Sequence, residues 1–518
     1  MTTVVRVRAP RHRRRCGALL LVTCVASCEG APQPLPPEFA PITIEIIAGA
    51  TPQTAVVGTP VAVAPSVRVR SASGKPMVGA QVVFTSIRDG GQVSFPLHLT
   101  DSEGLATVAA WIMGPTVGPH ALSAIVLSST TDTRAEFSAT ATAGPPASVS
   151  VSPVPVVVSV GGTQAITALH LDAYGNLVGP AAGAVLTVAN TSIATVNAGG
   201  TVTGIAEGAT RLTVTSGALP PRSVTVAVGP QPSGAVVTSM NIGTAALGLG
   251  VSSANVLYAT AQSGTLRRVD LPSETAGATV TLTGPAFDVA FSPDGATAYA
   301  SVPSLGVINV IKVATDSVTR SIGVCNTPLR VRVSGDGNTL YAGCYGAQLV
   351  RVNLANDAVA SLTVGTGDVL GIALDPTRPR LFTVSDLGSI TEVALTTFTV
   401  TQTSNIPGLV LQSALVSPDG GRLFVGNRVG PMRVLNTATL STLSSLTAAP
   451  GAFDIALTRN GGQLYIVVNG ANSVVVLDAL DYTVRRTITV SAPRRVVFDA
   501  TGTIAVVTGD GGSLTFIK

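Results

Sequence analysis

Acidic and basic side chains recur at one position of a long C-terminal repeat, where they could form a shared site. Successive copies of this position lie 41 or 42 residues apart and hold Asp288, Arg330, Gly371, Ser413, Asp454 and Arg495. Carboxylates accept protons and hydrogen bonds, and guanidinium groups bind carboxylates or phosphates through paired N–H donors. The alternation of Asp with Arg therefore predicts either a ligand site or a set of ion pairs that neutralise each other.

Asp386 and Asn469 add polar groups from the turns that follow the second strand of their repeats. Polar groups that converge on a channel mouth are a common place for a ligand. The candidate ligand-binding set is therefore Asp288, Arg330, Ser413, Asp454, Arg495, Asp386 and Asn469.

Histidine, the commonest general base and metal ligand, is absent from residues 235–518. The chain also lacks the zinc-protease, nucleophile-elbow, P-loop and EF-hand patterns. Two chemical alternatives stay open: an acid pair of Asp288 and Asp454, or a calcium-assisted lactonase site that adds Asp386 and Asn469. Asp288 and Asp454 belong to distant repeats, which argues against a shared small substrate, and no motif establishes the calcium site. We therefore predict no catalytic residues, no metal and no cofactor.

Large apolar residues mark the period of the repeat that carries these positions. At steps of 41 or 42 they read Tyr258, Tyr299, Tyr341, Phe382, Phe424, Tyr465 and Val506. Turn sequences such as Pro293-Asp294-Gly295 lie four residues before most of them. A period of about 40 to 45 residues with strand, turn and strand is typical of β-propeller blades. Seven copies predict a seven-bladed β-propeller.

The seventh copy has three strand patterns where the others have four. Residues 235–240 resemble an outer strand and are expected to complete it, so that residues 235–518 close into a ring after a linker at 230–234. The repeats resemble the YVTN-type propellers of surface proteins, which are allied to a lactonase-like group. The Tyr-Val-Thr-Asn run that gives these propellers their name is degenerate here, and Tyr465-Ile466-Val467-Val468-Asn469 is the nearest copy.

Residues 41–144 alternate apolar and polar side chains in short runs, a pattern typical of a β-sandwich. The segments Gly74-Lys75-Pro76 and Asp101-Ser102-Glu103-Gly104-Leu105-Ala106 resemble turn signatures of the group 1 bacterial Ig-like domains of invasin- and intimin-type proteins. The resemblance implies an Ig-like fold, with these segments as turns and not as ligand sites.

Residues 145–229 form a second pattern of short strands and turns. The order Gly200-Thr201-Val202-Thr203-Gly204-Ile205-Ala206-Glu207-Gly208 resembles the group 2 bacterial Ig-like domains. That resemblance implies a spacer or adhesive module at a cell surface. The complete expectation is an all-β chain with two Ig-like sandwiches in tandem, followed by a seven-bladed β-propeller.

The first 27 residues are expected to be a signal peptide. An arginine-rich start precedes a short apolar run that ends Val25-Ala26-Ser27-Cys28, which resembles a bacterial lipobox with Cys28 as the lipidated residue. Cys24 fits that pattern less well, and ordinary signal cleavage with a free Cys28 is the alternative. Glu29 is not the Asp that favours inner-membrane retention, so the outer membrane or cell surface is expected. Residues 28–40 are a Pro-rich tether.

The charge balance gives no reason to expect nucleic acid. The formal net charge is +4, but six arginines lie in the predicted signal peptide. Without them, 31 − 6 = 25 basic residues stand against 27 acidic ones, or −2. Sparse, nearly balanced charge lacks the basic footprint of nucleic-acid binding.

Cys325 and Cys344 are the only cysteines outside the predicted signal segment and its lipobox. The turn at residues 334–338 would place them nearly opposite each other on neighbouring strands, within disulfide reach. Export would allow the bond to form. We therefore predict a structural disulfide, with two buried thiols as the alternative.

Taken together, the sequence predicts a non-enzymatic, lipid-anchored protein of the cell envelope. The Ig-like domains would be spacers that present the propeller to an unknown protein or glycan, for binding, adhesion or scaffolding. The alternative is a propeller hydrolase or lactonase that acts at the mouth of the central channel.

Overall fold

The computed structural model describes residues 42–88, 91–127, 133–243 and 246–518. Within these residues the elements are β-strands and two short 3₁₀ helices, η2 (Pro303–Leu305) and η3 (Asn469–Ala471). The predicted all-β fold class is therefore confirmed. No helix of the described residues is long and apolar enough to cross a membrane. The predicted signal peptide, Cys28 and the tether lie outside the described residues.

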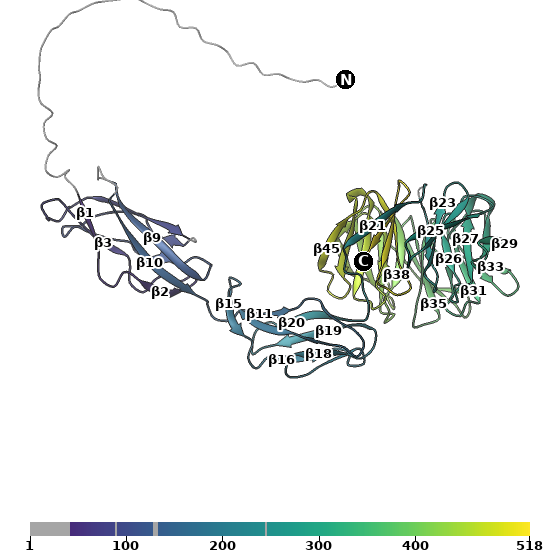
Figure 1. The fold of residues 1–518 in the computed structure, drawn as a ribbon, viewed down its shortest axis with the longest axis horizontal. Coiled ribbons are helices and arrows are strands. Elements are labelled where there is room, and N and C mark those ends of the chain that lie inside the picture. The colour runs from purple at the N-terminus through teal and green to yellow at the C-terminus, as the bar shows by residue number, and fades with distance from the viewer. Residues whose placement is uncertain (1–41, 89–90, 128–132, 244–245) are drawn as a thin grey trace, which may run out of the picture. The chain divides into compact units, whose positions relative to one another are not determined.

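The chain divides into two compact units, with the boundary between Gly144 and Pro145. The described residues of the first unit form three sheets, and several of their strands are labelled in Figure 1. In spatial order, the largest consists of β2 (Gln53–Val56), β10 (Arg134–Thr142), β9 (Gly118–Val126), β4 (Gln81–Arg88) and β6 (Leu97–Leu99). The other two are β1 (Thr43–Ile46), β3 (Ser66–Arg70) and β7 (Leu105–Thr107), and the pair β5 (Gln92–Val93) and β8 (Trp111–Ile112).

One hydrophobic core holds the sheets of the first unit together. Buried and exposed side chains alternate along β10, as expected when one face of a strand packs on a core. Phe84 of β4, Phe137 of β10 and Val69 of β3 belong to the same core, which therefore joins the two larger sheets. Trp111 is fully buried within it.

The second unit begins with residues 145–229, whose strands form three sheets around a core that contains Leu212, Val214 and Val226. A four-stranded sheet has the order β12 (Val156–Val158), β20 (Arg222–Val228), β19 (Gly208–Thr215) and β16 (Val185–Val188). The two three-stranded sheets are β11 (Ser148–Ser152), β14 (Thr167–Leu171) and β15 (Leu177–Pro180), and β13 (Thr163–Ala165), β18 (Thr201–Gly204) and β17 (Ala194–Val196). We call residues 145–229 the bead.

Residues 235–518 contain seven four-stranded antiparallel sheets, here called the ring and numbered sheet 1 to sheet 7. Sheet 1 is β22 (Leu249–Val251), β23 (Val256–Ala261), β24 (Thr265–Asp270) and β25 (Thr275–Thr281). Sheet 2 is β26 (Val289–Phe291), β27 (Thr297–Val302), β28 (Val307–Lys312) and β29 (Ser317–Gly323). Sheet 3 is β30 (Pro328–Val333), β31 (Thr339–Cys344), β32 (Gln348–Asn353) and β33 (Ala358–Thr363).

The remaining sheets follow the same plan, and only the last departs from chain order. Sheet 4 is β34 (Val369–Leu374), β35 (Arg380–Ser385), β36 (Ser389–Ala394) and β37 (Thr399–Asn405). Sheet 5 is β38 (Leu411–Val416), β39 (Arg422–Asn427), β40 (Pro431–Asn436) and β41 (Thr442–Pro450). Sheet 6 is β42 (Ala452–Leu457), β43 (Gln463–Val468), β44 (Ser473–Asp478) and β45 (Val484–Thr489). Sheet 7 is β46 (Pro493–Phe498), β47 (Ala505–Gly509), β48 (Ser513–Ile517) and β21 (Val236–Asn241).

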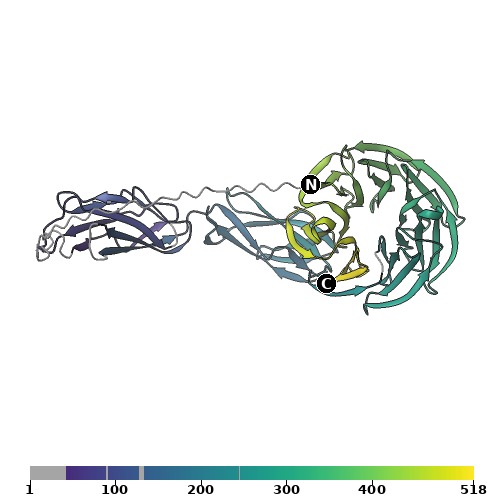
Figure 2. The same ribbon diagram turned by 90° about the horizontal axis from the view of Figure 1, so that it is seen from above.

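The seven sheets close on themselves in two ways. The first strand of each sheet contacts the first strand of the next, and β46 contacts β22, so these strands surround a central opening (Figure 2). The strand β21 pairs antiparallel with β48, and Ala235 and Lys518 exchange two backbone hydrogen bonds of 2.9 and 3.0 Å. The start of the ring thereby covers an edge that would otherwise be unpaired.

The 41-residue spacing corresponds to one sheet of the ring. The large apolar residue of each copy lies in the second strand and is nearly or fully buried. Tyr258 stacks on Phe291 of the next sheet with ring centroids 5.1 Å apart, and Tyr465 meets Phe498 at the same distance. Each of these aromatic residues therefore packs one sheet against its neighbour, which explains their regular recurrence.

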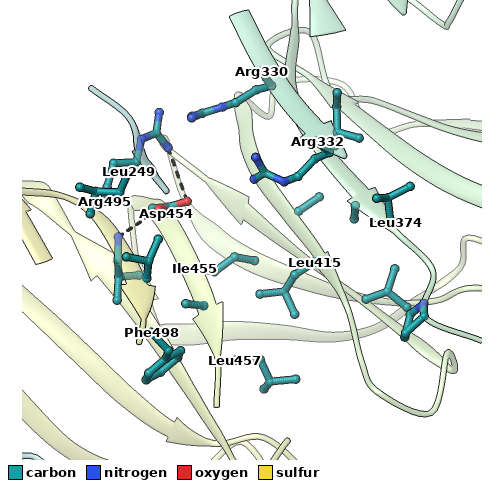
Figure 3. Close-up of a pocket in the computed structure, with 18 of the residues that line it drawn as sticks. Leu249, Arg330, Arg332, Leu374, Leu415, Asp454, Ile455, Leu457, Arg495 and Phe498 are labelled. Atoms are coloured by element: carbon teal, nitrogen blue, oxygen red, sulfur yellow. Dashed lines mark hydrogen bonds and ion pairs between the residues drawn. The ribbon is translucent and has the colours of Figure 1, made fainter. Parts of the chain in front are cut away.

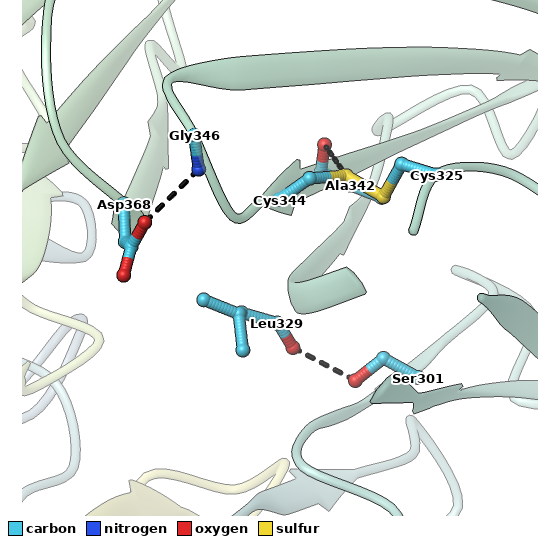
Figure 4. The surroundings of a disulfide bond; sticks show 7 residues. All are labelled: Ser301, Cys325, Leu329, Ala342, Cys344, Gly346 and Asp368. Carbon is cyan, nitrogen blue, oxygen red and sulfur yellow. Dashed lines mark hydrogen bonds between the residues drawn. A yellow bond between two sulfur atoms is a disulfide. The ribbon is translucent and has the colours of Figure 1, made fainter. Parts of the chain in front are cut away.

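Cys325 and Cys344 are joined by a disulfide, as predicted (Figure 4). Its position differs from the expectation, because Cys325 lies in the connection between β29 and β30 and not on a strand. Cys344 at the end of β31 is opposite Pro328, and a β-bulge between Pro328 and Arg330 shifts the register of that pair. The bond therefore ties the connection between sheets 2 and 3 to the second strand of sheet 3.

Candidate ligand-binding site

The repeated polar position lies at the start of the first strand of each sheet. Asp288 directly precedes β26, Arg330 lies in β30, Asp454 in β42 and Arg495 in β46. In sheets 3 to 7 the register of the first strand shifts just before this position. Such β-bulges re-aim the side chain that follows. These first strands surround the central opening, so the charged side chains gather there.

The same three-sheet arrangement of an Asp, an Arg and a backbone carbonyl occurs twice around the opening. Arg330 lies 3.7 Å from Asp288 of the preceding sheet, and its Nε donates to the Leu370 carbonyl of the following sheet at 2.7 Å. Arg495 lies 3.5 Å from Asp454, and its Nε donates to the Leu247 carbonyl at 2.6 Å. Each guanidinium group is therefore held between the sheets on its two sides.

Backbone N–H groups fix the two carboxylates in matching ways. Asp288 accepts a hydrogen bond of 3.2 Å from the N–H of Val331, and Asp454 accepts one of 3.1 Å from the N–H of Val496. Each donor is the residue that follows the paired arginine. An aspartate and an arginine on neighbouring sheets are thus held by backbone as well as by charge, which makes the layer rigid.

In both arrangements, the sheet that supplies the backbone carbonyl has glycine at the repeated position. A Cβ on Gly248 would lie 2.6 Å from the Phe287 carbonyl oxygen and from the Cα of Asp288. A Cβ on Gly371 would lie 2.6 Å from a methyl of Val384 and 3.1 Å from the backbone nitrogen of Ala414. Neighbouring first strands approach too closely there for a larger residue.

A cavity of about 550 Å³ runs along the first strands of the ring. It extends from the layer of Asp and Arg to the turns that follow the first strands, and its wall includes Pro376, Pro418 and Thr458. Figure 3 shows Arg330, Arg332 and Arg495 pointing toward the space around Asp454, while Leu415, Leu457 and Phe498 lie further along the wall. The cavity therefore has a charged end and an apolar body.

Positive charge predominates in the cavity. Its wall carries four arginines and two aspartates, a formal excess of +2. The fourth arginine, Arg459, lies at the turn end, 3.1 Å from Glu207 of the bead, and its side chain is 61% exposed. The charged end, defined here as Asp288, Arg330, Arg332, Asp454 and Arg495, keeps an excess of +1.

Arg330 carries its charge in an unfavourable environment. Burial, and then the nearby charge of Arg495, lower the pKa of Arg330 to about 9. The group stays charged at neutral pH, but its charge is disfavoured. Its Nη2 and the Nη1 of Arg495 are buried without a hydrogen-bond acceptor in the described protein. Arg495 Nη1 still forms an ion pair with Asp454. The distance of 3.5 Å between Nη1 and the carboxylate oxygen is too long for a good hydrogen bond.

Three of the predicted residues lie outside the cavity wall. Ser413 is buried against β39, where a Cβ on Gly426 would lie 2.3 Å from its hydroxyl oxygen. Asp386 accepts the N–H of Asp368 at 2.7 Å, and Asp368 in turn accepts the N–H of Gly346 at 2.9 Å (Figure 4). Asn469 donates to the Pro493 carbonyl at 3.0 Å. Asp386 therefore holds the connection that leads into its own sheet 4, and Asn469 of η3 contacts the first strand of sheet 7.

Sequence reasoning missed two charged residues of the cavity wall. Arg332 is two residues after Arg330 on the same strand, and its Nη1 lies 3.2 Å from Asp288. Period-two alternation along a strand was the available signal, because residues i and i+2 share a face. Arg459 belongs to a turn sequence, and nothing in its local pattern indicated that the turn borders a cavity.

No three His, Cys, Asp or Glu side chains come together as a metal site in the part of the chain that the structure describes. The four residues considered for a calcium-assisted site are thus distributed over different places. Asp288 and Asp454 line the cavity, whereas Asp386 bonds the backbone of Asp368 and Asn469 bonds that of Pro493.

The fold and the cavity define an all-β protein whose ring of sheets surrounds a ligand-sized site. No family model and no curated protein matches the chain. Among solved structures, the chain is similar to the hydrazine synthase of Kuenenia stuttgartiensis, with 17% sequence identity and a TM-score of 0.51. The match covers 55% of this chain and 98% of that one. At this identity the likeness concerns the fold alone.

Proposed function

We propose that residues 235–518 are a seven-bladed β-propeller whose central cavity binds a small ligand without transforming it. In this proposal the chain is exported and lipid-anchored through Cys28, and the Ig-like regions at 41–144 and 145–229 present the propeller at the cell envelope. The ligand is either a free molecule or a group on a protein or glycan partner.

The cavity is the observation that carries the proposal. Its volume of about 550 Å³ lies within the range of roughly 300–1,000 Å³ found for ligand sites. Apolar walls with a few fixed charged groups are the usual composition of such sites. Residues from several sheets contribute to the wall, so a rigid scaffold positions it.

The engagement of both carboxylates favours binding over catalysis. Asp288 accepts from Val331 N–H and faces Arg330 and Arg332. Asp454 accepts from Val496 N–H and faces Arg495. A carboxylate in such contacts orients the guanidinium groups around it, whereas a general acid or base needs a proton to exchange with substrate.

Contacts between the bead and sheet 6 are consistent with a bead that holds the propeller in place. The hydroxyl of Thr225 donates to Asp478 at 2.7 Å, and Arg211 donates to the Leu480 carbonyl at 3.0 Å. The side chain of Asp478 is 1% exposed. A buried polar contact of this kind fixes the bead against the ring.

Binding and turnover can be separated in one experiment on the full chain. Pools of lactones, glycosides, sugars, organic acids and short peptides would be screened by thermal shift, and every pool would be assayed for products. The proposal predicts stabilisation by at least one pool with no product formed. Turnover of a lactone or glycoside that is lost in a folded Asp454→Asn variant would establish the hydrolase instead.

The anchor is tested separately from the cavity. Cys28→Ser should move the chain from the membrane fraction to the soluble fraction of the native envelope, because the acyl chains supply the membrane affinity. Cys24→Ser is the matched control and should leave the chain with the membranes. Retention of the Cys28→Ser chain would contradict the lipid anchor.

A further inference from the structure

We infer that the cavity binds an organic monocarboxylate with an apolar body, an inference that rests on the proposed binding function. The carboxylate would lie at the charged end, among Arg330, Arg332 and Arg495. The apolar body would extend toward the turns along Leu415, Leu457 and Phe498.

The charge of the site argues for one negative group. Three guanidinium groups face two carboxylates at the charged end, which leaves an excess of +1. A single carboxylate would neutralise that excess, whereas a phosphate dianion would reverse it. A cationic ligand would add to a positive surplus in a largely buried site, which is unfavourable.

The unpaired hydrogen-bond donors of the site also favour a carboxylate ligand. Arg330 Nη2 is buried without an acceptor in the described protein, and the side chain of Arg330 is 4% exposed. Figure 3 shows its guanidinium directed into the space shared with Arg332 and Arg495. An N–H donor without an acceptor in a buried site is costly. A carboxylate offers several lone pairs to such donors.

Access to the charged end is provided by Arg332. Its side chain is 42% exposed, in contrast to the buried Arg330, so Arg332 is the arginine of the charged end that solvent reaches most readily. Arg332 already bonds Asp288 and the Val331 carbonyl through Nη1. The planar guanidinium carries further N–H donors that can pair with a ligand carboxylate.

The rest of the wall explains why the ligand needs an apolar body. From the charged end to the turns the lining includes aliphatic and aromatic side chains: Leu249, Ile372, Leu374, Leu415, Val416, Ile455, Leu457, Val497 and Phe498. A small hydrophilic acid would leave this surface without apolar contacts. Burial of a chain or ring against it adds about 25 cal/mol for each Å² of apolar area.

The test is calorimetric titration of the full chain at neutral pH with decanoate, decanol and decylammonium. These probes share one apolar chain and differ in the charge of the head group. We expect decanoate to bind at least about tenfold more tightly than decanol, since charged hydrogen bonds are lost with the neutral head. Decylammonium should bind more weakly than either.

Two pairs of variants assign the effect to the cavity. Arg332→Gln should weaken decanoate binding about tenfold or more, whereas Arg320→Gln should not. Arg320 is the matched control because its side chain is 44% exposed and also pairs with an aspartate, Asp357. Leu457→Asn should weaken both decanoate and decanol, whereas the same change at exposed Leu443 should have no effect.

Three outcomes would overturn the inference. Equal affinity for decanoate and decanol, with sensitivity to Leu457→Asn, would refute the carboxylate and leave the binding function intact. Decanoate affinity that Arg332→Gln does not change would also refute it. If no decyl probe binds, the ligand class is refuted, and the proposed binding function fails as well only if none of the screened pools stabilises the chain.

Discussion

Asp288 and Asp454 show how single residues organise the centre of the ring. Each is buried or nearly so, each accepts one backbone N–H from the next sheet, and each faces an arginine of that sheet. Removal of one partner from such a pair leaves an uncompensated charge in a poorly solvated place. The pairs therefore matter to the fold through the cost of breaking them.

Asp454→Ala should destabilise the chain by about 3–5 kcal/mol, because Arg495 would stay buried without its carboxylate. Denaturant unfolding followed by far-UV circular dichroism measures this. Asp294→Ala is the control, since Asp294 lies in an exposed turn and bonds only within it. A loss below about 1 kcal/mol for Asp454→Ala would indicate that the pair is solvated.

The depressed pKa of Arg330 predicts a pH dependence of anion binding. Its pKa of about 9 means that the guanidinium is charged at neutral pH and loses its proton as pH rises through that value. Decanoate affinity should therefore be constant from about pH 6 to 8 and fall above about pH 9. Titration calorimetry across this range tests it, and Arg330→Gln should abolish the dependence.

The same shift has the opposite sign for folding. The pKa of Arg330 is lower in the folded chain than its ordinary value of 12.5, so the unfolded chain binds more protons between these values. This group therefore makes the native state more stable as pH rises through that window, and its full penalty is present below about pH 9. Loss of anion binding above pH 9 would thus not reflect unfolding caused by Arg330.

At the scale of elements, the disulfide holds a connection that has no strand partner of its own. It closes a loop with a sequence separation of 19 residues. Loops of this length give about 3 kcal/mol of stabilisation through the unfolded state. Cys325→Ala with Cys344→Ala should lose about that amount in denaturant unfolding. The wild type should lose a similar amount in reductant, to which the double variant should be indifferent.

The contact between the bead and sheet 6 also makes a prediction. Asp478 accepts from Thr225, from Arg485 and from the N–H of Leu480. Thr225→Val removes only the bond from the bead and should cost about 1 kcal/mol. Asp478→Ala also leaves Arg485 without its carboxylate partner and should lower the free energy of unfolding by about 3–5 kcal/mol. Limited proteolysis of residues 230–234 should be faster in both variants, and unchanged in Thr213→Val within the bead.

The sequence was informative wherever a regular spacing sets the structure. The aromatic column at Tyr258 and its equivalents predicts strands at a 41-residue period, and those strands pack sheet on sheet. The alternation of Asp288 and Arg330 likewise predicts groups that meet across neighbouring sheets. Both patterns depend on side chains that every copy must place in the same way.

The sequence was less informative where bulges and loops decide the direction in which a side chain points. The hydroxyl of Ser413 lies beside Gly426 of β39, although the same bulge precedes Arg330, Asp454 and Arg495, which line the cavity. The repeat spacing does not distinguish these two outcomes. The part played by Arg332 requires knowledge of which strand face borders the cavity. Asp386 is a loop contact because its carboxylate accepts a backbone N–H, a local preference that spacing does not record.

At the scale of the whole molecule, the two compact units divide the chain at Gly144 and Pro145. The first unit has one hydrophobic core, and the second contains the core of the bead together with those between the sheets of the ring. No core cluster of the described residues is shared between the two units, so each should unfold independently of the other. Scanning calorimetry of the full chain should resolve two transitions, and a chain of residues 145–518 should retain one of them. A single transition that is lost on truncation would contradict this division.

The central claim is that the ring holds a ligand in its cavity between the charged end and the apolar wall. A crystal structure of the full chain with decanoate tests it most directly. The account predicts electron density for the carboxylate within hydrogen-bond distance of Arg332 and of Arg330 or Arg495, with the chain along Leu415 and Leu457. An empty cavity at saturating decanoate, or density only on the outer surface, would contradict the account.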